Sequence, residues 1–303
     1  MKIGVSGSTG LIGSALVATL RRRGDDVVPL VRRRVAAGET AIAWDPEHGS
    51  IDRAGLEGLG AVIHLAGENV FGRWSPAKKN RIRDSRVLGT RLLSDALAGL
   101  HRRPRTFLAA SAIGYYGDRG AEELTEHSAP GEDFLAHVAR DWEAATSPAS
   151  HAGIRVVNMR IGVVLAPSGG ALGKMLPAFR LGVGGPIGSG NQYVSWIALE
   201  DIVNAMVHVL AHDDVTGPVN LTAPTPVPNR EFAKILGKVL GRPAVVTVPT
   251  FALRVAFGTE GAAMLQSGQR VLPSRLLALG FQFSFPTMEP ALRHLLAARE
   301  SAR

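Results

Sequence analysis

The sequence predicts an α/β protein built around a doubly wound parallel sheet. Apolar strand patterns alternate with helical patterns through the first half of the 303 residues, and a glycine-rich turn joins the first strand to the first helix. Apolar residues make up 46% of the chain, which is enough for a large core. Because strand, helix and strand alternate, successive strands are expected to run parallel.

The first half of the chain divides into short apolar runs and longer amphipathic stretches. Short runs bounded by turn residues predict strands, and apolar residues recurring every three or four positions predict helices. Ser75 followed by Pro76 marks a helix start, since serine caps a helix and proline fits its first turn. The predicted strands cover 2–6, 26–31, 40–44, 61–65, 105–110 and 154–159, and the predicted helices cover 11–22, 76–100 and 133–147.

The second half has shorter elements. Glycine pairs and a Pro/Thr-rich stretch at 222–229 follow Pro167, and such residues separate elements with loops. We therefore expect a first domain over 1–164 and a smaller, substrate-side subdomain over 165–303. Residues 193–212 are expected to return to the first domain, because a strand-like segment there runs into a helix with Asp201 near its start.

Composition and charge narrow the functional classes. The formal net charge is +8, yet the 34 Lys and Arg residues are scattered rather than gathered into a basic stripe, so nucleic-acid binding is not expected. The absence of cysteine excludes disulfides and thiolate sites. No apolar run reaches the roughly 18 residues of a membrane span, and the first strand starts at Lys2 without a leader, so we expect a cytoplasmic protein with no membrane segment.

Residues 2–13 carry the strongest functional signal. The apolar strand runs into Gly7, Gly10 and Gly13, spaced three apart, and then into a helix. The first glycine permits a tight turn, the second lets backbone N–H groups approach a pyrophosphate, and the third lets helix and strand pack closely. This pattern predicts a Rossmann-type dinucleotide site. The residues expected to bind the coenzyme here are Gly7, Ser8, Thr9, Gly10, Leu11, Ile12 and Gly13.

The end of the second strand indicates which dinucleotide binds. A carboxylate there selects a free ribose 2′-hydroxyl, whereas a cation accommodates a 2′-phosphate. The chain has Arg32, Arg33 and Arg34 at this point, and the next acidic residue is Glu39. We therefore predict NADP as the cofactor, with Arg32 and Arg33 as the phosphate clamp. The alternative is a solvated basic turn.

Several short segments share the motifs of one protein family. They are Gly7–Gly13, His64–Asn69, Gly72–Ser75, Arg86–Thr90, Ser111–Asp118 and Ser195–Asp201, followed by Val248–Phe251, Gln269–Pro273 and Gly280–Phe283. In this order they resemble an atypical branch of the extended short-chain dehydrogenase/reductases, the NAD-dependent epimerase/dehydratase superfamily, with its C-terminal domain of unknown function. The resemblance implies that Leu65, Ala66 and Gly67 also border the coenzyme.

The catalytic dyad of that superfamily is missing from this sequence. Its members use a Tyr hydroxyl as acid or base and a Lys four residues on that lowers the Tyr pKa. The only tyrosines here are Tyr115, Tyr116 and Tyr193, and none has a lysine four residues later. Leu135 and Ala139 are the nearest counterparts of the dyad, and neither can move a proton.

Three polar residues remain candidates for contact with substrate. Ser111 follows a predicted strand and corresponds to the superfamily's serine, although Ala112 is an alternative for that position and Ser111 could instead cap a loop or helix. Tyr115 and Tyr116 come next. Without a neighbouring cation, either phenol is expected to donate a hydrogen bond rather than abstract a proton, and one of them is expected to pack in the core.

Arg86 lies on the apolar face of the long predicted helix. The stripe around it consists of Ile82, Gly89, Leu93, Ala96, Leu97 and Leu100. A guanidinium on that face must find partners. We expect Arg86 to reach toward the nicotinamide-side pocket, where it would replace the missing lysine or bind an anionic group. The alternative is an interior arginine held by backbone carbonyls or a carboxylate.

Two functional hypotheses follow. The first is an NADP-binding oxidoreductase or epimerase-like enzyme acting on a small molecule that the sequence does not identify. The second is a binding protein that senses NADP(H) without turnover, which the missing dyad favours. His208 and His212 lie four residues apart, and a position at a helix end explains them better than a metal site.

Overall fold

The structure is a computed structural model that describes residues 1–300, with side chains described through residue 297. Within these residues the largest sheet has eight strands in the order β12-β8-β6-β5-β1-β2-β3-β4. They are parallel except for β4, which pairs antiparallel with β3. The strands are β1 (Lys2–Ser6), β2 (Asp26–Val31), β3 (Ile42–Asp45), β4 (Ser50–Ile51), β5 (Ala61–His64), β6 (Thr106–Ala112), β8 (Arg155–Ile161) and β12 (Gly217–Leu221).

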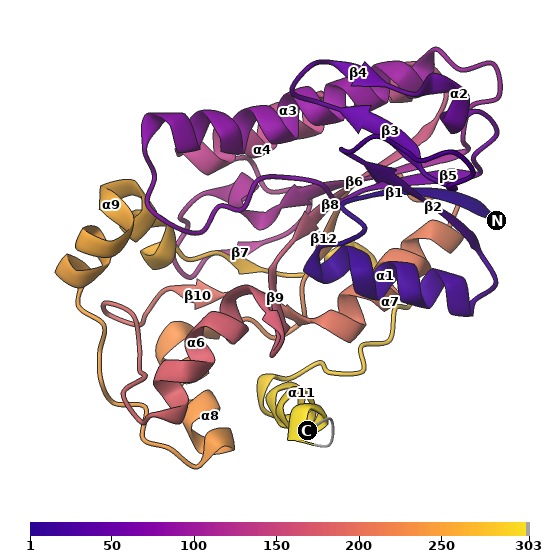
Figure 1. Cartoon of the computed structure of the whole chain (residues 1–303). Coiled ribbons are helices and arrows are strands. Elements are labelled where there is room, and N and C mark those ends of the chain that lie inside the picture. Colours follow the sequence, from indigo (N-terminus) through magenta and orange to yellow (C-terminus); the bar gives the residue numbers. More distant parts are fainter. Residues whose placement is uncertain (301–303) are drawn as a thin grey trace.

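Helices cover both faces of this sheet, so the sheet is doubly wound as predicted (Figure 1). On one face, α1 (Leu11–Arg22) packs against α7 (Leu199–Ala211). On the other, α3 (Pro76–Ala98) packs against α4 (Phe134–Ala144) and α5 (Ser147–His151). Each face has its own buried apolar cluster, one holding Leu16 with Met206 and the other holding Leu93 with Phe107. Both faces of the sheet are therefore withdrawn from water, which explains its nearly continuous apolar strands.

The C-terminal part of the chain forms a third apolar cluster beside the sheet. Its buried residues include Phe179, Trp196 and Leu236. The contributing helices are α6 (Gly170–Arg180), α8 (Asn229–Leu240) and α11 (Met288–Glu300). The remaining elements of this part are β9 (Val163–Ala166), β10 (Tyr193–Val194), β11 (Trp196–Ala198), β13 (Val227–Pro228), α9 (Thr250–Gln266), β14 (Arg270–Val271) and α10 (Ser274–Ala278).

Buried polar side chains join this region to the sheet. Asp201 on α7 accepts backbone hydrogen bonds from Ser284 at 2.8 Å and Phe285 at 2.9 Å. Burial raises the pKa of the Asp201 carboxyl, an effect that these two bonds oppose. Ser195 donates to the carbonyl of Gln269 and accepts from the N–H of Val271. The Asp201 carboxylate and the Ser195 hydroxyl are both buried. Their hydrogen bonds therefore satisfy polar groups that would lower the stability of the fold if they were left unpaired.

Three short elements lie between strands of the large sheet. Strand β7 (Glu123–Leu124) pairs in parallel with β14, and η1 (Ile113–Tyr116) follows β6 directly. Helix α2 (Arg53–Leu56) lies between β4 and β5. Within residues 1–300, no helix combines the length and hydropathy needed to cross a bilayer.

Candidate functional site

The glycine-rich turn lies where the winding of the sheet reverses, between β1 and β5. Gly7 has φ +68°, and a Cβ built on it would lie 2.8 Å from the carbonyl carbon of Leu65. The loops after the two strands therefore touch. A Cβ on Gly13 would lie 2.0 Å from the carbonyl oxygen of Gly7, so only glycine allows α1 to start this close to the turn. Carboxyl ends of strands at such a reversal are where open α/β sheets bind ligands.

The start of α1 offers unpaired donors to that position. Gly10 is the extended N-cap residue, and no side chain among residues 1–300 caps the first turn. Thr9 and Gly10 are exposed, whereas Ser8, Leu11 and Ile12 are half-buried. An uncapped helix N-terminus without an intervening side chain fits a phosphate, because backbone N–H groups and the helix dipole both favour an anion there.

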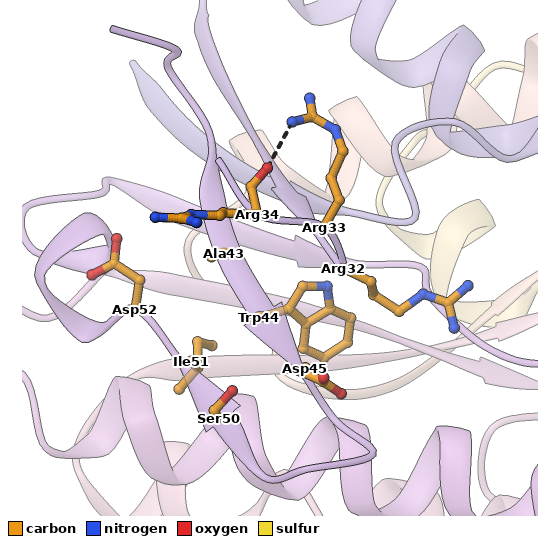
Figure 2. Close-up of a pocket in the computed structure, with 9 residues that line it drawn as sticks. All are labelled: Arg32, Arg33, Arg34, Ala43, Trp44, Asp45, Ser50, Ile51 and Asp52. Carbon is orange, nitrogen blue, oxygen red and sulfur yellow. Dashed lines mark hydrogen bonds between the residues drawn. The ribbon is translucent and has the colours of Figure 1, made fainter. Parts of the chain in front are cut away.

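A shallow pocket of about 290 Å³ lies at the end of β2. Figure 2 shows Arg32, Arg33 and Arg34 around Trp44, with guanidinium groups that point in different directions. Arg33 forms a bidentate ion pair with Glu39, one bond of which measures 2.8 Å, and Arg33 also donates to the carbonyl of Arg34. The pair lowers the pKa of Glu39 to about 2. Arg32 is exposed and belongs to no ion pair among the described residues, so the two predicted clamp residues differ in availability.

The pocket is bordered by β3 and β4 on its other side. The lining residues there are Ala43, Trp44, Asp45, Ser50, Ile51 and Asp52. Trp44 is only 4% exposed, so the open lining consists of the three guanidinium groups with Ala43, Ser50 and Ile51, and the guanidinium groups suit a phosphorylated ribose.

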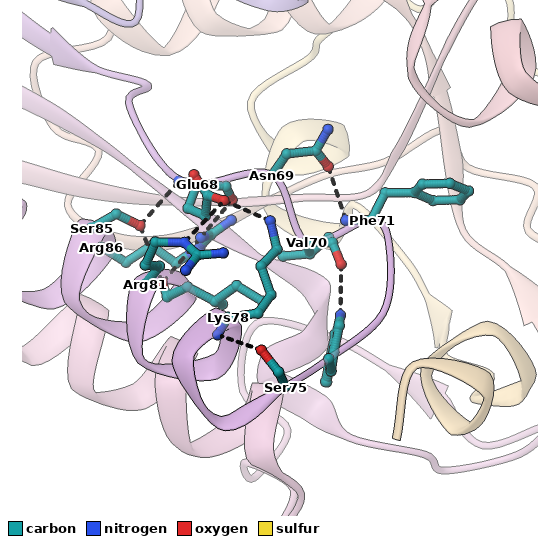
Figure 3. Close-up of polar contacts among 11 residues, drawn as sticks. Glu68, Asn69, Val70, Phe71, Ser75, Lys78, Arg81, Ser85 and Arg86 are labelled. Carbon is teal, nitrogen blue, oxygen red and sulfur yellow. Dashed lines mark hydrogen bonds and ion pairs between the residues drawn. The ribbon is translucent and has the colours of Figure 1, made fainter. Parts of the chain in front are cut away.

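Side chains of α3 hold the loop after β5 through hydrogen bonds to its backbone groups. The Glu68 N–H donates a hydrogen bond to the Ser85 hydroxyl at 3.0 Å, and the Glu68 carbonyl accepts one from Arg86 Nη1 at 2.9 Å. The same Nη1 donates to the carbonyl of Ile82. Figure 3 shows the contacts of Glu68 with Ser85 and Arg86 beside the side chain of Lys78. Gly67, just before Glu68, lies against the Arg86 guanidinium.

Arg86 therefore combines features of both sequence hypotheses. It is tied to backbone carbonyls, as an interior arginine would be, and its guanidinium stacks 5.0 Å from the Trp142 ring. Burial lowers the pKa of Arg86 to about 10, a value at which it keeps its charge at neutral pH. It also borders Gly67 of the predicted coenzyme loop.

Ser111 belongs to a buried polar network that the sequence did not predict. Its hydroxyl donates to Glu143 on α4 at 2.7 Å. Glu143 forms a bidentate pair with Arg160 on β8, at 2.8 and 2.9 Å. Because the Ser111 proton points to a carboxylate held by a guanidinium, the hydroxyl offers lone pairs rather than a donor to any further ligand.

The two adjacent tyrosines have different surroundings. Tyr116 is buried, donates to Asn220 at 2.7 Å and accepts from Arg160 at 3.0 Å. Burial raises its pKa to about 12. Tyr115 is half-buried, its ring lies 3.5 Å from the Arg160 guanidinium carbon, and its hydroxyl bonds to no residue in 1–300. Tyr116 is thus the packing residue of the pair.

Apolar side chains stand beside η1 at the positions expected for the dyad. Leu135 packs over Gly114, where a Cβ would lie 3.4 Å from the Leu135 Cβ, and Ala139 is buried. Ala112 is half-buried, whereas Ser111 points into the network under α4. The network partners Glu143, Arg160 and Asn220 were missed because each comes from a separate element. A charged residue between apolar residues at the end of a predicted strand, as Arg160 is between Met159 and Ile161, would have been the available signal.

Three histidines lie outside the polar network of Ser111, Glu143 and Arg160. His64 is fully buried in β5, where burial lowers its pKa to about 4, and its Nδ1 lies 2.6 Å from the Ser6 hydroxyl. His208 and His212 stack at 4.1 Å between ring centroids and bond to backbone carbonyls. Across the described part of the chain, no group of three or more His, Cys, Asp or Glu residues could hold a metal ion.

The sheet, its reversal point and the glycine loop define a Rossmann-type protein of the short-chain dehydrogenase/reductase class. Residues 3–221 match the family model described as the NAD dependent epimerase/dehydratase family. The chain belongs to that family, and its residues 248–295 match a domain of unknown function, DUF1731.

Similar proteins cover almost the whole chain. An epimerase family protein of Mycobacterium bovis is 45% identical over 96% of both chains. The epimerase family protein YfhF of Bacillus subtilis is 36% identical over 99% of this chain and 100% of its own length. A crystal structure of the human epimerase family protein SDR39U1 with NADPH is 36% identical, superposes with a TM-score of 0.90, and covers 98% of this chain and 99% of that one.

Proposed function

We propose that this chain binds NADP(H) and acts as an oxidoreductase or epimerase-like enzyme on a small molecule. The observation that carries the proposal is the uncapped, glycine-lined start of α1 at the sheet reversal, with Arg32 and Arg33 at the end of the adjacent strand β2. A family relative of 36% identity crystallised with NADPH, which supports the phosphorylated coenzyme.

The residues of the turn would hold the coenzyme through its phosphates. Backbone N–H groups of Ser8, Thr9, Leu11 and Ile12 would face the pyrophosphate, whereas the Gly10 N–H closes the turn on the Gly7 carbonyl. Leu65, Ala66 and Gly67 would border the nicotinamide half. Arg32 would meet the ribose 2′-phosphate directly. Arg33 would do so after exchanging Glu39 for phosphate, because a guanidinium binds either anion with the same fork of donors.

The polar groups nearby would orient the substrate rather than transfer its proton. The coenzyme supplies hydride chemistry when it is bound. Tyr115 has the available hydroxyl, Ser111 offers lone pairs, and Arg86 keeps a positive charge beside Gly67. Leu135 and Ala139 would offer no titratable group at the positions where the resemblance places the proton relay.

The second candidate function is an NADP(H) sensor without turnover. It is favoured by one observation: the Ser111 proton and the Tyr116 hydroxyl are both committed to internal hydrogen bonds. A binding protein needs no available acid or base, so these contacts would serve only to stiffen the floor of the site.

Calorimetric titration of the purified chain with NADP+ and NAD+ tests coenzyme binding. We expect NADP+ to bind at least about tenfold more tightly, since a charged phosphate contact contributes on the order of 1.5–3 kcal/mol. Arg32→Ala should reduce that preference. Arg91→Ala removes the same charge from an exposed ion pair on α3 and serves as the control. Equal or tighter binding of NAD+ would contradict the assignment.

Fluorescence of bound NADPH then separates enzyme from sensor. Oxidation of the coenzyme with one of a panel of carbonyls, quinones or nucleotide sugars is the expected result for an enzyme. NADPH that stays bound and unoxidised with the whole panel would favour the sensor.

A further inference from the structure

Two cations reach the carboxylate of Glu68, directly after residues 65–67, and a third cation bonds the Glu68 backbone carbonyl. Lys78 Nζ lies 2.6 Å from Glu68 Oε1, Arg81 Nε lies 3.8 Å from the same oxygen, and Arg86 Nη1 bonds the Glu68 carbonyl. Figure 3 shows the side chains of all three around Glu68. One carboxylate among three cations leaves two positive charges in excess, a balance that favours a further anion.

The cations stand where a helix ordinarily disfavours them. Lys78 and Arg81 lie in the first two turns of α3, whose N-terminus carries the positive end of the dipole, and its first turn has no acidic residue. The helix does not need them for its start, because Ser75 caps it at the Lys78 N–H. Stability of α3 therefore does not explain their position.

The Glu68 side chain can move away from Lys78 and Arg81 without breaking the hydrogen bonds that hold the loop. The loop is anchored by the Glu68 N–H on Ser85 and the Glu68 carbonyl on Arg86, and neither bond uses the side chain. The Glu68 side chain is 35% exposed, whereas that of Lys78 is 14% exposed, so the acceptor lies on the solvent side of the cation. Arg86 Nε and Nη2 make no hydrogen bond to any described residue.

We propose that the carboxylate of Glu68 occupies the place of an anionic substrate group, and that Lys78, Arg81 and Arg86 form a subsite for that group. The inference rests on the proposed function in one respect, namely that the anion belongs to a second ligand beside NADP(H). A phosphate or a carboxylate has the chemistry to displace Glu68, since each accepts several charge-assisted hydrogen bonds from Lys and Arg.

Titration of inorganic phosphate into the NADP+-saturated chain tests the subsite. Glu68→Gln removes the internal competitor and keeps both backbone anchors, so it should tighten phosphate binding about tenfold. The double variant Lys78→Met, Arg81→Met should weaken it about tenfold or more and should leave NADP+ affinity within about twofold. Both effects should shrink at high ionic strength.

The matched control removes the same charge from the same helix. Lys79 pairs with Glu260, and Arg83 lies near Asp84 and Asp141, outside the cluster. Lys79→Met, Arg83→Met should therefore leave phosphate affinity within about twofold. Thermal melts of all variants confirm that each is folded before titration.

Two results would overturn the subsite. Phosphate affinity that changes with neither Glu68→Gln nor the double variant would make the cluster a structural ion pair. A double variant that loses NADP+ affinity in proportion to phosphate affinity would make the cluster part of the coenzyme site. If NADP+ did not bind at all, the proposed function would fail separately, because phosphate titration of the coenzyme-free chain still reports on the cluster.

Discussion

The buried hydroxyl of Tyr116 holds η1 to the sheet beneath the candidate site. It donates to Asn220 on β12 and accepts from Arg160 on β8, so one phenol joins two neighbouring strands to η1. Its pKa of about 12 keeps it protonated at neutral pH. The neighbouring Tyr115 hydroxyl bonds to no residue in 1–300.

We predict that Tyr116→Phe lowers the free energy of unfolding by about 2 kcal/mol, because Asn220 Oδ1 loses its donor in a buried site. Urea unfolding followed by circular dichroism measures the change. Tyr115→Phe is the matched control and should stay within about 0.5 kcal/mol. Equal losses of unfolding free energy in the two variants would show that the Tyr116 hydroxyl does not stabilise this part of the fold specifically.

His64 makes stability depend on pH. Burial lowers its pKa to about 4, so the folded chain keeps the ring neutral, whereas the unfolded chain takes up a proton below the ordinary pKa of 6.5. The unfolded state therefore binds more protons between these values, and stability falls as pH drops from about 6.5 toward 4.

The predicted loss attributable to His64 is about 2 kcal/mol between pH 7 and pH 5. Urea unfolding at the two pH values measures it. His64→Gln lacks the titrating ring and should show a pH dependence weaker by that amount, whatever its absolute stability. The same slope in the variant and the parent chain would rule His64 out as the source.

Single residues show how far the sequence could define the site. Gly13 was predictable, because the glycine spacing encodes a close approach to Gly7 that lies within a few residues of chain. The bond from Ser111 to Glu143 was not, since it joins residues 32 apart whose meeting depends on how α4 sits on β6. The pairing of Arg33 with Glu39 was also missed, although both residues were noted, because loop conformation decides it.

At the scale of elements, α7 is attached to the C-terminal segment in part through a buried carboxylate. Asp201 accepts from two successive backbone N–H groups, those of Ser284 and Phe285, just before α11. The sequence placed Asp201 near a helix start, where it reads as a cap. In the structure, both carboxylate oxygens of Asp201 instead accept hydrogen bonds from the segment before α11.

We predict that Asp201→Asn destabilises the protein by about 2 kcal/mol, because an amide NH2 would face one of two backbone N–H donors. Proteolysis should cut more readily near 284–288 than in the parent chain. Glu200→Gln is the control. It changes the preceding residue, which forms an exposed ion pair with His294, and it should change stability and proteolysis little. Proteolysis confined to other loops would show that Asp201 does not secure this segment.

Elements with a local signature were predictable, and elements defined by distant pairing were not. The structure confirms strands near all the expected positions and helices at α1, α3 and α4, and Ser75 caps α3 as predicted. Strand β12 was missed, because Gly217 and Pro218 at its start are poor strand formers and pairing with β8 at the sheet edge stabilises it. The short pairs β9 with β11 and β7 with β14 likewise depend on partners far along the chain.

At the scale of the whole molecule, the start of α1 and the C-terminal region are in direct contact. Leu11, the first residue of α1, lies against Gly169 and Gly170, where built Cβ atoms would lie 3.5 and 3.2 Å from its side chain. Glu126 connects the sheet to the C-terminal region, because its Oε1 accepts from the N–H groups of Asn220 on β12 and Arg275 on α10. Contacts of this kind couple the stability of the two regions.

We therefore predict that NADP+ stabilises the chain as one unit. At a concentration one hundred times Kd, a ligand that binds only the folded state adds about 2.7 kcal/mol. Hydrogen exchange measured by mass spectrometry should show that increase equally in amides of β5, beside the coenzyme loop, and of α8 in the C-terminal cluster. Asp201→Asn should lessen the gain at α8 before it lessens the gain at β5, because it loosens the connection between them. Protection that rises at β5 alone in the parent chain would mean that the two regions unfold independently and that coenzyme binding is confined to the sheet.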